Sequence, residues 1–334
     1  MRMQSNYWRT LGVFALLATV SGEAAAQLQG GANWDTSRDQ IGSGGGLPGP
    51  ASGSRNASLD ALNKILSASQ LPPLDRTVYL SIRAFQLTRL GREADSQKDV
   101  AEMGKLLPNA WQVVLSTTQP DLAGGGDRAA ALRILDYGLQ KKPNDPWLIV
   151  GQAQVHMQIA DFARALTLLD GAVASAAGAG DKRTALFYRG HANFNLGNYA
   201  QAASDFDGSL EGRTTLKSRL SGELWRYAAQ VPGKQDARAT LNKSIGNENL
   251  YEWPGPIAKF LLGKMTAGEL EVAAESDPNA KRTNGNCPAA FFAGMDALRA
   301  GNKQRAREQL QLAQARCPTV SELNWAASSQ LKRL

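Results

Sequence analysis

Thiol and disulfide chemistry in this 334-residue chain depends on two residues, because Cys287 and Cys317 are its only cysteines. We expect Cys287 to precede the first helix of a helical hairpin and Cys317 to close the second. Antiparallel helices bring those two ends to the same side, which allows a disulfide. Two buried free thiols are the alternative. A metal site would need further ligands, and both histidines lie far earlier in the chain, so we expect no metal.

Acid–base chemistry near neutral pH would fall to His156 and His191, the only histidines. We expect His156 to fill an interior packing position and His191 to lie on a helix face where it could contact a ligand or titrate. The sequence contains no metalloprotease, serine-hydrolase, phosphate-loop or Cys-x-x-Cys motif. Its scattered carboxylates form no pattern that favours paired-acid catalysis. We therefore expect no catalytic residue, no cofactor and no enzymatic activity.

The elements that must position these residues follow from a repeat of small residues. A small residue recurs at steps of 34 to 37 positions, and a large apolar residue follows each one four positions later. The small residues are Ser96, Ala131, Ala165, Ala202 and Ala237, with Ala306 further on. This is the period of a two-helix unit, in which small residues let the helices approach closely. The hydrophobic content of 43%, rich in alanine and leucine, agrees with helices.

Two stretches carry the repeat motif most fully. The first contains Leu186, Gly190, Gly197, Tyr199, Ala202 and Phe206, and the second contains Gly294, Gly301, Ala306, Leu310, Ala313 and Pro318. Both resemble the tetratricopeptide repeat, a helix–turn–helix unit of about 34 residues. The resemblance implies an all-α tetratricopeptide-repeat solenoid of roughly seven helical hairpins over residues 58–334, with a C-terminal capping helix.

In tetratricopeptide proteins the first helix of each hairpin lines a concave groove, and the resemblance implies which side chains reach it. The groove residues that we expect from the phase of the repeat are Phe85, Arg89, Gln154, Met157, Phe187, His191, Phe194 and Asn195. Aromatic, amide and basic groups together suit an extended peptide, whose backbone needs hydrogen-bond partners and whose side chains need pockets. The alternative is that Phe187 and Phe194 only pack between helices.

The N-terminus, residues 1–26, has the organisation of a signal peptide. Arg2 and Arg9 supply positive charge, residues 11–20 form an apolar stretch, and small residues precede Gln27. We expect cleavage before Gln27 and export, and an uncleaved membrane anchor is the alternative. No later stretch of the sequence is long and apolar enough to predict a transmembrane helix.

Residues 27–57 lack periodicity and are rich in glycine, serine and proline, which is typical of a disordered linker. The formal net charge of the chain is +7, and it falls to +6 when Arg2, Arg9 and Glu23 leave with the signal peptide. This excess of cations could favour anionic partners in the cell envelope, although lysine and arginine are spread along the chain. We expect no nucleic-acid partner.

A closer resemblance covers residues 250–334. Its motifs are EWPGPIAKFLLG from residue 252, CPAAFFAG from residue 287 and ELNWAASSQLKRL at the C-terminus. This part resembles bacterial periplasmic tetratricopeptide proteins related to the lipoprotein adaptors of cell-envelope proteases and peptidoglycan hydrolases. The resemblance implies a protein that dimerises and holds client enzymes without doing chemistry. The lipoproteins carry a cysteine at the cleavage site, where this chain has Gln27, so we expect no lipid anchor.

These observations predict a protein-binding scaffold in the periplasm of a Gram-negative bacterium. Its partners would be protein or peptide clients, including envelope enzymes. Formation of a homodimer is a further possibility. Two alternatives remain. A glycan-binding or secretion-apparatus component would show aromatic platforms aligned along the groove. A hydrolase on a helical-repeat frame would show titratable residues converging on the concave face.

Overall fold

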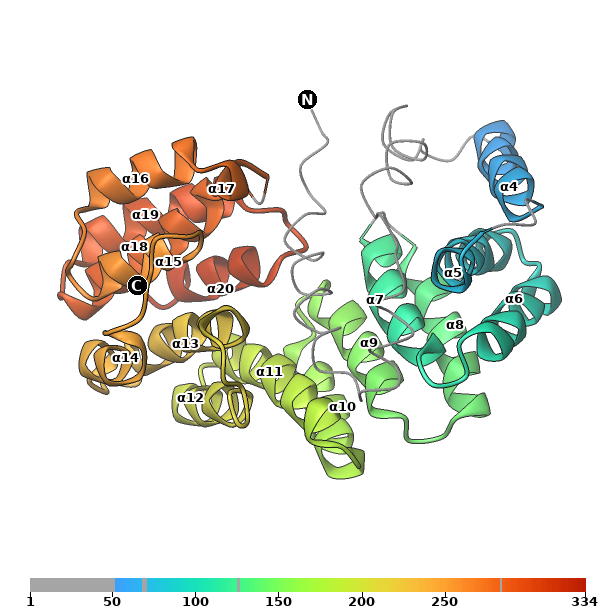
Figure 1. Cartoon of the computed structure of the whole chain (residues 1–334), viewed down its shortest axis with the longest axis horizontal. Helices are drawn as coiled ribbons and strands as arrows, with labels where there is room; N and C mark the ends of the chain where they lie inside the picture. Colours follow the sequence, from blue (N-terminus) through green and yellow to red (C-terminus); the bar gives the residue numbers. More distant parts are fainter. Residues whose placement is uncertain (1–51, 68–70, 125–126, 283) are drawn as a thin grey trace. The chain divides into compact units, whose positions relative to one another are not determined.

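The computed structural model describes residues 52–67, 71–124, 127–282 and 284–334. Within these ranges the chain forms seventeen helices, α4 to α20, and no strand (Figure 1). The all-α class that the sequence predicts is therefore confirmed. The described helices fall into two compact units. The first contains residues up to 159 together with 167–185, and the second contains residues 160–166 and 186–334.

The expected signal peptide, residues 1–26, and most of the expected linker lie outside the described residues. The first described helix, α4, runs from Ser52 to Leu66. It therefore begins before residue 58, where we expected the repeat region to start. None of the helices in the described part of the chain is both long and apolar enough to span a membrane.

The first unit is built from helix pairs joined by short connections. After α4 it contains α5 (Pro73–Arg89), α6 (Glu93–Leu106), α7 (Trp111–Ala123), α8 (Arg128–Lys141) and α9 (Pro146–Met157), with parts of α10 (Phe162–Ser175) and α11 (Ala179–Leu196). Helix α5 packs against α6, and α7 packs against α8, as hairpin partners. Helix α7 also packs against α5 and α9, and α6 packs against α8. First helices therefore stack on first helices, as expected for tandem two-helix repeats.

Local sequence signals set the ends of these helices. Gly91 adopts a φ of +72° in the turn between α5 and α6, a conformation that glycine takes without steric cost. At the start of α9, the carboxylate of Asp145 accepts hydrogen bonds from the backbone N–H groups of Trp147 and Leu148, at 3.0 and 3.2 Å. Pro146 occupies the first turn, where its missing N–H is not needed. These signals place the hairpin turns where the repeat requires them.

The second unit continues the pairing and becomes less regular toward its middle. It contains α12 (Tyr199–Gly208), α13 (Leu216–Gln230), α14 (Ala237–Ile245), α15 (Gly255–Leu261), α16 (Ala267–Ser276), α17 (Pro278–Arg282), α18 (Asn286–Arg299), α19 (Lys303–Arg316) and α20 (Glu322–Leu331). Helix α13 packs against α12 and α14, and α18 packs against α15, α16, α19 and α20. The short helices α15 and α17 lie in the stretch where the sequence repeat is weakest.

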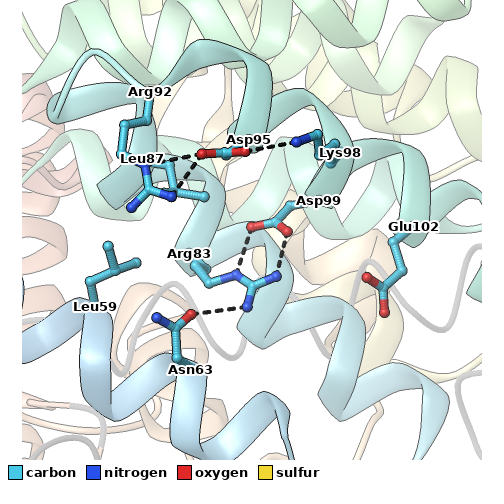
Figure 2. A pocket seen from close by; sticks show the side chains of 9 residues that line it. All are labelled: Leu59, Asn63, Arg83, Leu87, Arg92, Asp95, Lys98, Asp99 and Glu102. Atoms are coloured by element: carbon cyan, nitrogen blue, oxygen red, sulfur yellow. Dashed lines mark hydrogen bonds and ion pairs between the residues drawn. The ribbon is translucent and has the colours of Figure 1, made fainter.

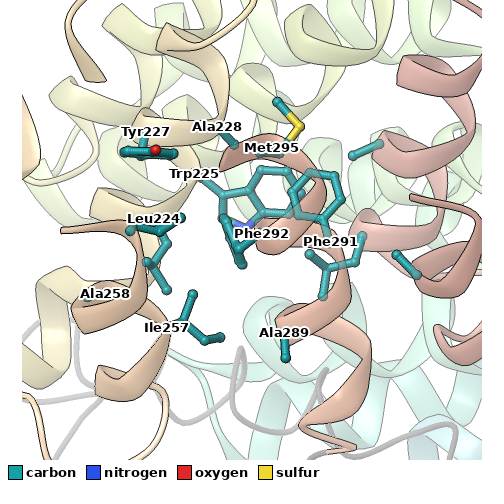
Figure 3. Packing of buried hydrophobic residues seen from close by; sticks show 14 of the residues in the cluster. Leu224, Trp225, Tyr227, Ala228, Ile257, Ala258, Ala289, Phe291, Phe292 and Met295 are labelled. Carbon is teal, nitrogen blue, oxygen red and sulfur yellow. The ribbon is translucent and has the colours of Figure 1, made fainter. Parts of the chain in front are cut away.

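Aromatic side chains fill the core of the second unit. The ring centroid of Trp225 on α13 lies 5.3 Å from that of Phe291 and 6.1 Å from that of Phe292, both on α18 (Figure 3). Phe194 of α11 and Phe206 of α12 are each 5.9 Å from Trp225 by the same measure. Burial of one such side chain stabilises a fold by roughly 1.5–3 kcal/mol relative to an exposed position. The cluster therefore holds four helices of this unit together.

The repeated small residues occupy the positions of closest helix approach. Ser96, Ala131, Ala165, Ala202, Ala237 and Ala306 are all buried. A Cβ atom added at Gly190 would lie 2.8 Å from the ring of Phe206, and one added at Gly294 would lie 2.8 Å from Leu310. Such distances leave no room for a side chain. The period in the sequence thus reflects helix packing, as expected.

The last helix, α20, returns to an earlier part of the second unit. Gln330 donates from Nε2 to the hydroxyl of Tyr199 at 2.9 Å, and Arg333 donates from Nη2 to the carbonyl oxygen of Asn195 at 2.7 Å. These pairs are 131 and 138 residues apart in the sequence. In a simple solenoid each repeat contacts only its neighbours. Helix α20 and the residues that follow it instead contact the α11–α12 hairpin.

Candidate functional site

The cysteines lie at the open end of the α18–α19 hairpin, as expected, although Cys287 is in the first turn of α18 and does not precede the helix. Cys287 and Cys317 form a disulfide, and both residues are buried. Asn284 donates from Nδ2 to the carbonyl oxygen of Arg316 at 2.8 Å, and Asn324 donates to that of Cys317 at 3.2 Å. The disulfide links the ends of α18 and α19, and the hydrogen bonds from Asn284 and Asn324 hold these ends to each other and to the start of α20.

Five of the eight expected groove residues are enclosed by neighbouring helices. Phe85, Met157, His191 and Phe194 are at most 1% exposed, and Asn195 is 5% exposed. This corrects the expectation that these side chains face an open groove, because none of them can contact a client in this conformation. The physical reason is that a first helix is covered on several sides, by its hairpin partner and by the next first helix. The phase of the repeat does not say which side stays open.

The other three expected groove residues, Arg89, Gln154 and Phe187, are half-buried. The guanidinium of Arg89 is 3.4 Å from the carboxylate of Asp127 and lies over the ring of Phe85, 5.7 Å from its centroid. Phe187 packs against the aromatic core of the second unit. Each of the three side chains keeps some exposed surface. Their role in binding a client stays a prediction.

A charged hollow of about 340 Å³ lies between α4, α5 and α6 of the first unit (Figure 2). Arg83 donates from Nε and Nη2 to the carboxylate of Asp99, at 2.9 and 2.6 Å. Arg92 and Lys98 donate to the carboxylate of Asp95 at 2.7 and 2.9 Å. The hydrogen bonds from Lys98 and Arg92 hold the pKa of Asp95 below its usual value, so this carboxylate stays ionised. The charges of this hollow neutralise one another and join α5 to α6.

A second hollow, of about 380 Å³, lies in the first unit between α8, α9 and α10, and we call it the α8–α10 hollow. It is lined by Leu139, Pro143, Asn144, Ile149, Gln152, Thr167, Leu168 and Gly171. Four of these side chains are apolar, and three carry an amide or hydroxyl group. Gln152 donates from its amide nitrogen to the carboxylate of Asp136, which orients the amide at the wall. Apolar walls with a few polar groups are typical of sites that bind an organic ligand or a side chain.

Gly171 keeps one wall of the α8–α10 hollow open. It lies within α10, and a Cβ atom added there would meet no atom within 4 Å. A glycine inside a helix costs about 1 kcal/mol relative to alanine. The crowding that explains Gly190 and Gly294 does not apply to Gly171. What the residue provides is uncovered helix backbone at the hollow.

Sequence reasoning missed this hollow. The sequence does contain one signal for it, a glycine in the middle of the apolar pattern of residues 162–175. The pattern alone cannot show whether such a glycine faces a packed helix or open space. That distinction depends on Leu139 and Ile149, which come from two other helices.

Comparison with known proteins yields structural likeness only. No protein-family model and no curated protein matches this chain. Among solved structures, it is similar to a tetratricopeptide repeat protein from Parabacteroides merdae, with 16% sequence identity and a TM-score of 0.40, over 75% of this chain and 98% of that one. It is also similar to the C-terminal part of a tetratricopeptide repeat-containing protein from Cytophaga hutchinsonii, with 15% sequence identity and a TM-score of 0.36. This similarity covers 78% of this chain and 90% of that one. The helix pairing described above, rather than these superpositions, defines the architecture.

Proposed function

We propose that this chain is an exported, periplasmic scaffold that binds protein or peptide clients and does no chemistry itself. The α8–α10 hollow is the observation that carries the proposal. It is a shallow recess on a framework of stacked helix pairs, and its apolar walls could take an apolar side chain of a client. Burial of this side chain would favour binding by roughly 25 cal/mol for each Å² of apolar surface removed from water.

The rim of the hollow suits a polypeptide more than a purely apolar ligand. Asn144 and Gln152 carry amide groups. Such groups can exchange hydrogen bonds with the N–H and C=O groups of an extended peptide, whose side chain occupies the recess. The client that we propose is therefore an extended segment with one aliphatic or aromatic anchor residue.

The periplasmic location in this proposal rests on the signal-peptide pattern of residues 1–26 and on the cysteine pair. Disulfides persist in oxidising compartments such as the bacterial periplasm and are rare in the cytosol. A buried pair at bonding distance, Cys287 and Cys317, is consistent with that environment.

The test is selection of binding peptides from a random library displayed on phage, followed by calorimetry with the synthetic peptides that emerge. We expect enriched peptides to share one apolar anchor position. The variant Gly171→Leu projects a side chain into the hollow and should weaken binding at least tenfold, whereas Gly171→Ala should preserve most of the affinity. Both variants should keep the melting temperature of the parent or raise it, because the added atoms meet open space.

Gly268→Leu provides the matched control, since Gly268 lies in α16 of the second unit and also has no neighbour within 4 Å of an added Cβ. This variant should bind as the parent does. Equal binding by Gly171→Leu and the parent would show that the hollow is not the client site.

A further inference from the structure

His191 is enclosed by aromatic rings in the second unit. Its ring centroid lies 4.3 Å from that of Trp225, 4.7 Å from that of Phe187 and 5.1 Å from that of Phe206, each at a steep angle. These rings come from α13, α11 and α12. Neither nitrogen of His191 has a hydrogen-bond partner among the described residues. The imidazole thus serves as an apolar packing element at the junction of three helices.

Several charged groups on these three helices pair with one another. On α11, Arg189 forms an ion pair with Asp205 of α12 at 2.7 Å. On α13, Glu223 pairs with Arg226. The remaining titratable neighbour, Tyr188 of α11, has its ring centroid 6.3 Å from that of His191. No carboxylate bonds to His191, so a proton on the ring would place a buried cation among aromatic side chains.

We propose that His191 makes the second unit an acid-sensitive switch, whose aromatic cluster packs around the neutral imidazole and opens when the ring takes a proton. The proposal is independent of the α8–α10 hollow, which belongs to the first unit. Opening would free the half-buried Phe187 and the faces of α11 and α12. The second unit would thereby change its accessible surface as the pH falls.

The direction of the pH effect follows from the burial of the ring. Burial lowers the pKa of His191 from 6.5 to about 3. The unfolded chain therefore takes up a proton more readily than the folded one as the pH falls below 6.5. The stability contributed by the neutral ring is complete above that pH and is lost progressively below it. Between about pH 7.5 and about pH 5, the unfolding equilibrium constant of this unit should rise about 30-fold through His191 alone.

Nuclear magnetic resonance tests the proposal directly, because the chain has only two histidines, His156 and His191. In protein labelled at the imidazole carbon, the signal of His191 should stay that of a neutral ring down to the pH at which the second unit opens. His156→Gln assigns the signals and serves as the matched control, since it should leave the acid sensitivity unchanged. A His191 signal that titrates in the folded protein near its ordinary pKa or above it would overturn the proposal, by showing that the rings stabilise the imidazolium.

Denaturant unfolding at the two pH values gives a second readout. In His191→Phe, most of the 30-fold dependence should disappear, because the ring no longer titrates. An unchanged dependence in a folded His191→Phe protein would contradict the proposal. If that variant does not fold, the titration of the unmodified protein still decides the question.

Discussion

Single glycine residues in this chain have opposite structural roles. Gly190 lies in α11 against the ring of Phe206, where an added Cβ would be 2.8 Å from the nearest ring atom. Gly171 lies in α10 beside open space. Helix propensity treats the two positions alike, since each glycine costs about 1 kcal/mol relative to alanine. Packing distinguishes them, because only Gly190 is needed for the close approach of two helices.

This contrast predicts opposite effects of the same substitution. Gly190→Ala should destabilise the second unit by about 1–3 kcal/mol, because the methyl group overpacks a core that has no room for it. Gly171→Ala should leave stability unchanged or raise it by up to about 1 kcal/mol. Denaturant unfolding followed by circular dichroism measures both. Equal effects of the two substitutions would show that the crowding at Gly190 is absent in solution.

At the scale of elements, the α18–α19 hairpin is held by a covalent bond as well as by packing. The disulfide pair Cys287 and Cys317 is separated by 30 residues in the sequence. A cross-link over a loop of that length reduces the conformational entropy of the unfolded chain, which is worth roughly 3–4 kcal/mol in the chain-entropy model. The hairpin also contacts α15, α16 and α20, so the bond stabilises the part of the second unit where the repeat is least regular.

Reduction should therefore weaken the second unit before the first. We expect the double variant Cys287→Ser with Cys317→Ser to lower the stability of the second unit by about 3 kcal/mol. Hydrogen exchange would show this as faster exchange in α18, α19 and α20 and little change in α5 to α9. Labelling of the denatured, unreduced protein with a thiol reagent should find no free thiol, and two labelled thiols would show that the pair is not oxidised.

At the scale of the whole molecule, the proposed location depends on processing of the N-terminus. We predict that the exported protein begins at Gln27, because small residues precede it and a short apolar stretch comes before them. N-terminal sequencing of protein recovered from the periplasmic fraction checks this. Replacing Ala24 and Ala26 by bulky residues should block the cleavage. A mature chain that retains Met1 would contradict the periplasmic proposal.

Much of the fold could be predicted from the sequence, because its causes are local. The small residues near every 35th position, such as Ala131 and Ala202, record where two helices of a hairpin meet. The turn at Gly91 and the cap at Asp145 are signalled by the residue types themselves. The proximity of Cys287 and Cys317 follows from hairpin geometry alone. Each inference needs only the neighbours of a residue along the chain or one helix pair.

The open surface and the long-range contacts could be decided only by the tertiary structure. The period of a helix shows that Phe85, His191 and Phe194 share faces with other apolar residues, but not which neighbouring helix covers each face. The α8–α10 hollow exists because three helices leave a space that none of them determines alone. The bond between Gln330 and Tyr199 joins residues 131 positions apart, a distance over which no local pattern carries information. Sequence therefore determined the repeated helix pair, and the packing of helices against one another decided which side chains remained exposed.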